Sequence, residues 1–243
     1  MQLASKRAFT MIELVLVIVI AGILAALAMP RLKRDNLREA AEQIITHIRY
    51  AQHLALQDDK FKFDSKGDPQ KEWYKKRWNL TFNNTSVTNC NIDKKNKSSW
   101  KYHIYHDIAK DGTGNLNSVS EAASNIIKNG HLLSAGWQGI SKVACKKVDQ
   151  SLNIGKRYGV TNVTLEGSCG RNRSQTISFD ELGRPMRTVS TTNGGGSARG
   201  YDRLLKDSCR INLSDGSSTV SILVHQNTGY ACILDPSTNQ CKK

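Results

Sequence analysis

The sequence predicts an α+β protein in which one long N-terminal helix packs on an antiparallel β-sheet or sandwich. Three observations predict this class: an apolar run that starts near residue 9, an amphipathic pattern that continues to about residue 57, and short β-type runs separated by turn sequences over residues 58–243. One helix followed by a series of strands is typical of α+β folds with an antiparallel sheet. A chain of 243 residues is also long enough to bury a substantial core behind that helix.

Residues 9–30 form the first half of the predicted helix and are expected to lie in a membrane. Between Leu14 and Met29 there is no charged or strongly polar side chain, and the apolar segment counted from Phe9 is 21 residues long. A helix needs about 20 such residues to cross a bilayer. Glu13 is the exception. Because an ionised carboxylate costs roughly 3 kcal/mol at membrane depth, Glu13 is a functional candidate that requires a partner.

A secretory signal peptide is the first alternative for this N-terminus. Lys6 and Arg7 precede the apolar run, and Ala26-Leu27-Ala28 offers small residues for cleavage after it. Against this interpretation, a charged residue lies inside the run and the small residue Ala8 lies before it.

The string KRAFTMIEL resembles the class III leader of type IV pilins and pseudopilins. It has a short basic leader, a small residue, an aromatic residue that opens the mature chain, and Glu at the fifth mature position. The resemblance implies that residues 1–8 are a leader and that a prepilin peptidase cuts between Ala8 and Phe9 and methylates the new amine of Phe9. It also implies that Glu13 acts in assembly. Family members usually carry Gly where Ala8 stands.

Residues 31–57 are predicted to form the amphipathic second half of the same helix, which would run from Phe9 to Gln57. Apolar residues recur there at alternating spacings of four and three, as in a helix with one apolar stripe. The stripe consists of Leu37, Ala41, Ile44, Ile48, Ala51 and Ala55, and the opposite face carries Arg38, Glu39, Glu42, Arg49 and Gln52. Pro30 is expected to kink or locally melt this helix.

Residues 58–243 are predicted to form a β-rich domain. Short runs rich in β-branched and aromatic residues, bounded by turn sequences, are typical of strands. The predicted strands are Trp78–Phe82, Trp100–Tyr105, Val160–Leu165, Gln175–Phe179, Met186–Val189, Cys209–Leu213, Thr219–His225 and Tyr230–Leu234. We also expect a short helix over Glu121–Lys128.

Two C-terminal blocks extend the resemblance. The phrases ISFDELGRP at Ile177–Pro185 and VSILVHQNTGYACI at Val220–Ile233 resemble strand-turn blocks of minor pseudopilins. That class includes the H component of type II secretion and the related DNA-uptake pilin.

All six cysteines lie beyond the apolar run, with no C-x-x-C pair among them. An even count in an exported domain favours disulfides over a metal site and an oxidising, periplasm-like location. The turn at Asp235-Pro236 favours a Cys232–Cys241 pair. Cys169 and Cys209 flank the ISFD block and a Gly-rich hairpin and form the next expected pair, and elimination leaves Cys90 with Cys145.

Two basic clusters are candidates for nucleic-acid binding. The formal charge is +14, or +12 after loss of Lys6 and Arg7 with the leader. Lys75, Lys76 and Arg77 are interleaved with aromatic residues, a composition suited to phosphate contact and base stacking. Arg171 and Arg173 lie in a Gly-Arg-Asn-Arg string that resembles a signature of the DNA-uptake pilin, although there it lies nearer the C-terminus. The alternative is a solvated basic surface.

The sequence contains no recognisable catalytic set, and no cofactor or metal site is expected. His103 and His106 are three apart in a predicted strand, where their side chains would point to opposite faces. Asp107–Ser118 lacks two of the oxygen ligands of a calcium loop. Gly194-Gly195-Gly196 lacks the Lys that follows the glycines of a phosphate-binding loop.

Together with the resemblance, these features predict a non-enzymatic minor pseudopilin of a type II secretion pseudopilus. Its expected partners are the prepilin peptidase, the other pseudopilins of the same fibre and the bacterial inner membrane, which it would cross once with the C-terminal domain in the periplasm. One alternative is a DNA-binding minor pilin for natural transformation, which would bind double-stranded DNA. Another is a minor pilin that primes a type IV pilus.

Overall fold

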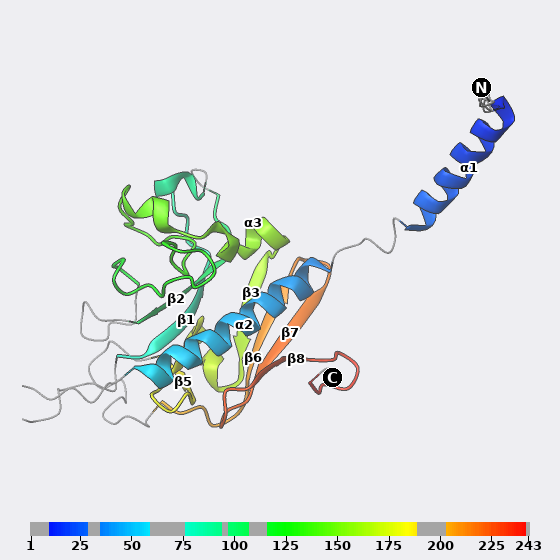
Figure 1. The fold of residues 1–243 in the computed structure, drawn as a ribbon. Coiled ribbons are helices and arrows are strands. Elements are labelled where there is room, and N and C mark those ends of the chain that lie inside the picture. The colour runs from blue at the N-terminus through cyan, green and yellow to red at the C-terminus, as the bar shows by residue number, and fades with distance from the viewer. Residues whose placement is uncertain are drawn as a thin grey trace, which may run out of the picture. The chain divides into compact units, whose positions relative to one another are not determined.

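The computed structural model describes residues 10–28, 35–58, 76–93, 97–106, 116–188 and 203–241, without the side chains of residues 25–28 and 171–173. The chain divides into two compact units, Met1–Asp35 and Asn36–Lys243. Among the described residues, the larger unit contains α2, α3, eight strands and four short 3₁₀ segments, and the smaller unit contributes α1 (Figure 1). The predicted α+β class is confirmed.

Helix α1, Met11–Ala28, contains the apolar run. Its large apolar side chains are exposed on every face of this unit, between 48% for Ile20 and 85% for Met11. A helix that is apolar all round requires an apolar environment in place of water. Over the part of the chain that the structure describes, no helix combines the length and apolar character needed to cross a membrane.

Helix α2, Asn36–Gln57, carries the predicted apolar stripe, which is buried and is wider than expected because Ala40 and Ile45 join it. The prediction of one continuous helix from Phe9 to Gln57 is wrong, because Asp35 is not helical and α1 and α2 are separate elements. Pro30 lies outside the described residues. A proline in this region removes a helical N–H donor and clashes with the preceding turn, which gives a physical reason for the interruption.

Two four-stranded sheets, both antiparallel in every described pairing, form the body of the larger unit. The first has the order β2-β1-β4-β5 and the second the order β3-β6-β7-β8. The strands are β1 Trp78–Asn83, β2 Lys101–His106, β3 Asn162–Glu166, β4 Thr176–Phe179, β5 Pro185–Arg187, β6 Cys209–Ser214, β7 Thr219–Val224 and β8 Ala231–Ile233. All eight predicted strands are present, with ends that agree or are shifted by one or two residues.

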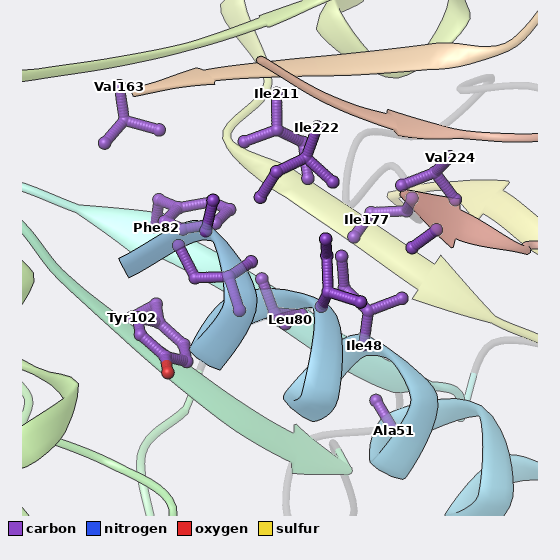
Figure 2. Close-up of a cluster of buried hydrophobic side chains, with 14 of the residues drawn as sticks. Ile48, Ala51, Leu80, Phe82, Tyr102, Val163, Ile177, Ile211, Ile222 and Val224 are labelled. Carbon is purple, nitrogen blue, oxygen red and sulfur yellow. The ribbon is translucent and has the colours of Figure 1, made fainter. Parts of the chain in front are cut away.

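The main core lies where α2 meets both sheets (Figure 2). Ile48 of α2, Leu80 of β1, Ile177 of β4, Ile211 of β6 and Ile222 of β7 are all completely buried. Burying one such side chain stabilises a fold by roughly 1.5–3 kcal/mol. The apolar stripe of α2 thus joins the two sheets into one body.

A subdomain formed by the β1–β2 and β2–β3 connections has a second, smaller core. Val87, Ile92, Leu132, Trp137 and Ile140 are buried together there, and the partly buried Cys90 packs against them. Apart from two predicted strands and a predicted short helix, the sequence suggested no architecture for residues 58–160, and this cluster organises much of the described part of that segment.

The helix predicted over Glu121–Lys128 is wrong. The Ala123 amide donates to the Ile104 carbonyl at 2.9 Å, and the Ile104 amide donates to Leu133 at 2.9 Å, so this segment follows β2 as an extended chain. Asn125 then forms a turn by accepting from the backbone amides of Ile127 and Lys128. Pairing with the open edge of β2 therefore outweighs the local helical tendency.

Helix α3, Ile154–Tyr158, was not predicted. Its first turn is capped by Asn153, whose side-chain oxygen accepts from the Lys156 amide at 3.1 Å. It ends at Gly159, whose φ of 75° lies in the left-handed region that favours glycine. At five residues the helix is too short for periodicity to reveal it, although its two caps are present in the sequence.

Candidate functional site

The N-terminus of α1 forms a reciprocal capping box. The Thr10 amide and hydroxyl both donate to the Glu13 carboxylate at 2.9 Å, and the Glu13 amide donates back to the Thr10 hydroxyl at 3.3 Å. In such a box, the Thr and the Glu three residues later each satisfy a donor of the first helical turn. The string Thr-x-x-Glu before an apolar run is the sequence signal of this box, although no capping role was predicted for Thr10.

The capping box orients the Glu13 carboxylate without exhausting it. A carboxylate has about four acceptor positions, and both Thr10 donors are bound by the same oxygen, Oε2. The other oxygen can still meet a cation. The predicted cleavage site between Ala8 and Phe9 lies outside the described residues, immediately before this cap.

Only part of the first basic cluster lies within the described residues. Lys76 is half-buried, and Lys75 lies outside them. Arg77 is 1% exposed, which contradicts its assignment to a nucleic-acid surface. Its pKa is lowered to about 10, mainly by burial, although Asp180 and Glu181 oppose that shift. Arg77 was misassigned because a charged run reads as surface, whereas the acidic residues that accompany it inside the fold are about a hundred residues away.

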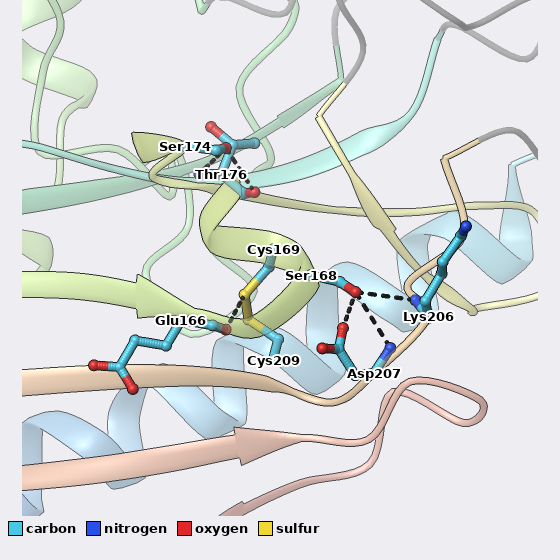
Figure 3. The surroundings of a disulfide bond; sticks show 8 residues. All are labelled: Glu166, Ser168, Cys169, Ser174, Thr176, Lys206, Asp207 and Cys209. Atoms are coloured by element: carbon cyan, nitrogen blue, oxygen red, sulfur yellow. Dashed lines mark hydrogen bonds between the residues drawn. A yellow bond between two sulfur atoms is a disulfide. The ribbon is translucent and has the colours of Figure 1, made fainter. Parts of the chain in front are cut away.

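The second basic cluster has a defined backbone. Arg171 and Arg173 lie in the 3₁₀ segment η6, Gly167–Arg173, and their side chains are outside the description. The segment is tied to the chain before β6, because the Ser168 hydroxyl accepts from the Lys206 and Asp207 amides at 3.1 and 3.2 Å (Figure 3). The Gly-Arg-Asn-Arg string is therefore part of an anchored segment that the fold holds in place.

All three predicted disulfides are confirmed. Cys90 pairs with Cys145, Cys169 with Cys209 and Cys232 with Cys241, at Cα separations of 5.2, 5.5 and 5.6 Å. The Cys169–Cys209 bond joins η6 to β6, next to the Ser168 contacts (Figure 3). The Cys232–Cys241 bond ties the end of the described chain to β8.

The two histidines of β2 have different surroundings. His103 is 2% exposed, with its Nε2 2.5 Å from Asn83 Nδ2 and its Nδ1 2.8 Å from the Ser134 hydroxyl. Burial, together with the nearby charge of Lys101, lowers the pKa of His103 to about 3. His106 instead stacks on Trp78 at 5.3 Å between ring centroids. Each histidine therefore has a packing role of its own.

Two of the candidate metal ligands among the described residues are already bonded to each other. Most of Asp107–Ser118, the stretch compared with a calcium loop, lies outside the described residues. Within the described ranges, His225, Cys232 and Cys241 bring three ligand atoms within 4.8 Å of one another. Two of these atoms are the sulfurs of a disulfide, which leaves them no thiolate to offer.

The capped apolar helix and the disulfide-bonded α+β unit fit a type IV pilin-like protein. The particular signal is at the N-terminus, where residues 3–29 match the family model of the prokaryotic N-terminal methylation motif. This motif is the prepilin-cleavage signal of type IV pilins and pseudopilins, and it implies processing by a prepilin peptidase and assembly with other pilins. No curated protein and no solved structure matches the chain with significance.

Proposed function

We propose that the protein is a minor pseudopilin, a non-enzymatic structural subunit of a type II secretion pseudopilus. The observation that carries this proposal is the Glu13 carboxylate, fixed by Thr10 at the start of an apolar helix inside the methylation motif. The two C-terminal blocks support the minor pseudopilin class, which includes both the H component of type II secretion and the related DNA-uptake pilin. The subunit would be anchored in the inner membrane, with the Asn36–Lys243 unit in the periplasm.

Cleavage after Ala8 places a new amine on Phe9, one residue before the cap. In an apolar setting, an isolated ammonium or carboxylate carries a large desolvation cost, and pairing the two offsets part of it. Glu13 of an incoming subunit is proposed to pair with the Phe9 amine of its neighbour and so to fix the axial register. The capping box contributes by holding the carboxylate in one orientation before assembly.

The test separates the charge of Glu13 from its capping role. Glu13→Gln retains a capping side chain, because Gln also serves at this position of the box, but it removes the charge. We expect this variant to be inserted, cleaved and methylated, yet absent from fibres recovered by pull-down. Thr10→Ala is the matched control, since it loses about 1 kcal/mol of capping but keeps the charge, and it should enter fibres. Normal incorporation of Glu13→Gln would refute the proposed pairing.

A second candidate function is DNA binding for uptake, which the net charge and the anchored Gly-Arg-Asn-Arg segment favour. The test is binding of double-stranded DNA to the full chain in uncharged detergent, between 50 and 200 mM salt. Phosphate contacts predict a steep loss of affinity with salt and little dependence on base sequence. Micromolar affinity near 150 mM salt that Arg171→Glu with Arg173→Glu abolishes would favour DNA uptake over secretion. Lys142→Glu with Lys146→Glu, on exposed residues of the subdomain, is the charge-matched control.

A further inference from the structure

A hollow of about 530 Å³ lies on the subdomain, beside α3. Lys128, His131, Lys156 and Arg157 line it together with one acidic residue, Asp149. Its size is within the range of small-molecule sites, which is about 300–1,000 Å³. The basic residues come from separate parts of the chain, so no run of charge in the sequence marks this hollow.

The single acidic residue is already engaged by the protein. Asp149 accepts from the Lys128 ammonium at 2.8 Å, from the Ser151 amide at 3.0 Å and from the Asn125 side chain at 2.7 Å. These contacts outweigh burial and lower the pKa of Asp149, so it stays ionised and fixes Lys128 at the wall of the hollow. Lys128 remains half-exposed and can still meet a ligand.

The other two permanent cations are less neutralised. Lys156 lies 3.7 Å from Asp93, but Asp93 is already paired with the buried Lys101 at 2.9 Å. The guanidinium of Arg157 lies over the Tyr158 ring at 5.1 Å, a contact that orients it without cancelling its charge. Both side chains are exposed. The hollow therefore holds three permanent cations and one carboxylate, which leaves two net positive charges.

We propose that this hollow binds a phosphate monoester. A phosphate monoester carries about −1.5 to −2 charges at neutral pH and three strong acceptor oxygens, which match the two net positive charges and the donors around the hollow. Arginine is suited to this role because its guanidinium donates two parallel hydrogen bonds to phosphate oxygens. The site does not depend on which fibre the subunit joins. The monoester can belong to a soluble molecule or to a lipid headgroup.

Calorimetric titration of the full chain, in uncharged detergent at 150 mM NaCl, tests the site with glycerol 3-phosphate. We expect saturable binding that weakens at least tenfold in Lys156→Glu with Arg157→Glu. Lys142→Glu with Lys146→Glu makes the same charge change on exposed residues that do not line the hollow, and should change the affinity less than twofold. Dimethyl phosphate, a monoanion, should bind at least tenfold more weakly than glycerol 3-phosphate.

Lys128→Gln is a second test variant that leaves α3 unchanged, in case the double substitution there disturbs folding. It should also weaken binding, while the near-ultraviolet circular dichroism stays unchanged. Vesicles of uncharged lipid with and without phosphatidic acid, which presents the same monoester, distinguish a headgroup from a soluble ligand. Selective vesicle binding assigns the lipid source, and binding of glycerol 3-phosphate alone assigns a soluble one. Absence of binding to both probes, or an equal loss in both double variants, would overturn the proposal.

Discussion

A drop in pH from 7.5 to 4.5 is expected to remove about 3 kcal/mol of stability through one buried imidazole, His103. Its pKa is about 3 in the folded protein, mainly because of burial, against about 6.5 in an unfolded chain. The unfolded state therefore binds the proton first. Stability contributed by the neutral ring is present above about pH 6.5 and is lost as the pH falls below it. At pH 4.5 the preferential protonation of the unfolded state lowers the free energy of unfolding by about 3 kcal/mol.

The assay is urea unfolding of the full chain in detergent micelles at both pH values, followed by tryptophan fluorescence. His103→Gln removes the titrating group, so its loss of stability between the two pH values should be smaller by about 3 kcal/mol. His53→Gln, on the exposed face of α2, is the control and should keep the wild-type pH dependence. His47 has a pKa lowered to about 4 by burial and should supply part of the remaining dependence. If His103→Gln and wild type lose equal stability on acidification, the reasoning fails.

Two further predictions concern the disulfides and Arg77. Replacing Cys90 and Cys145 by Ser should lower the free energy of unfolding by about 4 kcal/mol, and replacing Cys232 and Cys241 by Ser should lower it by about 2.5 kcal/mol. The two losses differ because the disulfides close loops of different length, with separations of 55 and 9 residues. Equal losses in denaturant titrations would contradict the chain-entropy argument. Arg77→Glu should destabilise the fold by about 3 kcal/mol or more, since it buries an acidic charge near two others. A melting temperature equal to that of wild type would contradict the burial of Arg77.

The features that were predicted correctly from the sequence are those that a local pattern of residues determines. The α2 stripe and the strands follow from periodicity, as in β6, where Cys209, Ile211 and Leu213 are buried and the residues between them are not. The disulfides were accessible for a similar reason, since turns or flanking strands bring two of the pairs together and the third is what remains.

Non-local contacts account for the main errors. The segment from Glu121 follows β2 because that strand offers unpaired backbone groups, which local propensity does not register. Arg77 is buried near Asp180, and the hollow unites Lys128 with Lys156, so neither environment is visible in a short window of sequence. The Thr10–Glu13 box is different, because its signal is local and was overlooked.

The edge strands of the two sheets determine whether another chain can add a strand to either sheet. The extended chain after residue 121 covers β2, Leu204 pairs with Met186 of β5, and Cys241 pairs with Leu234 just beyond β8. In the described part of the fold, β3 has only β6 as a partner strand, and its outward residues are Asn162, Thr164 and Glu166. Polar and charged edges disfavour strand addition from another chain. A second copy of this domain is therefore not expected to extend the β3–β6–β7–β8 sheet by adding a strand at β3, even at high local concentration.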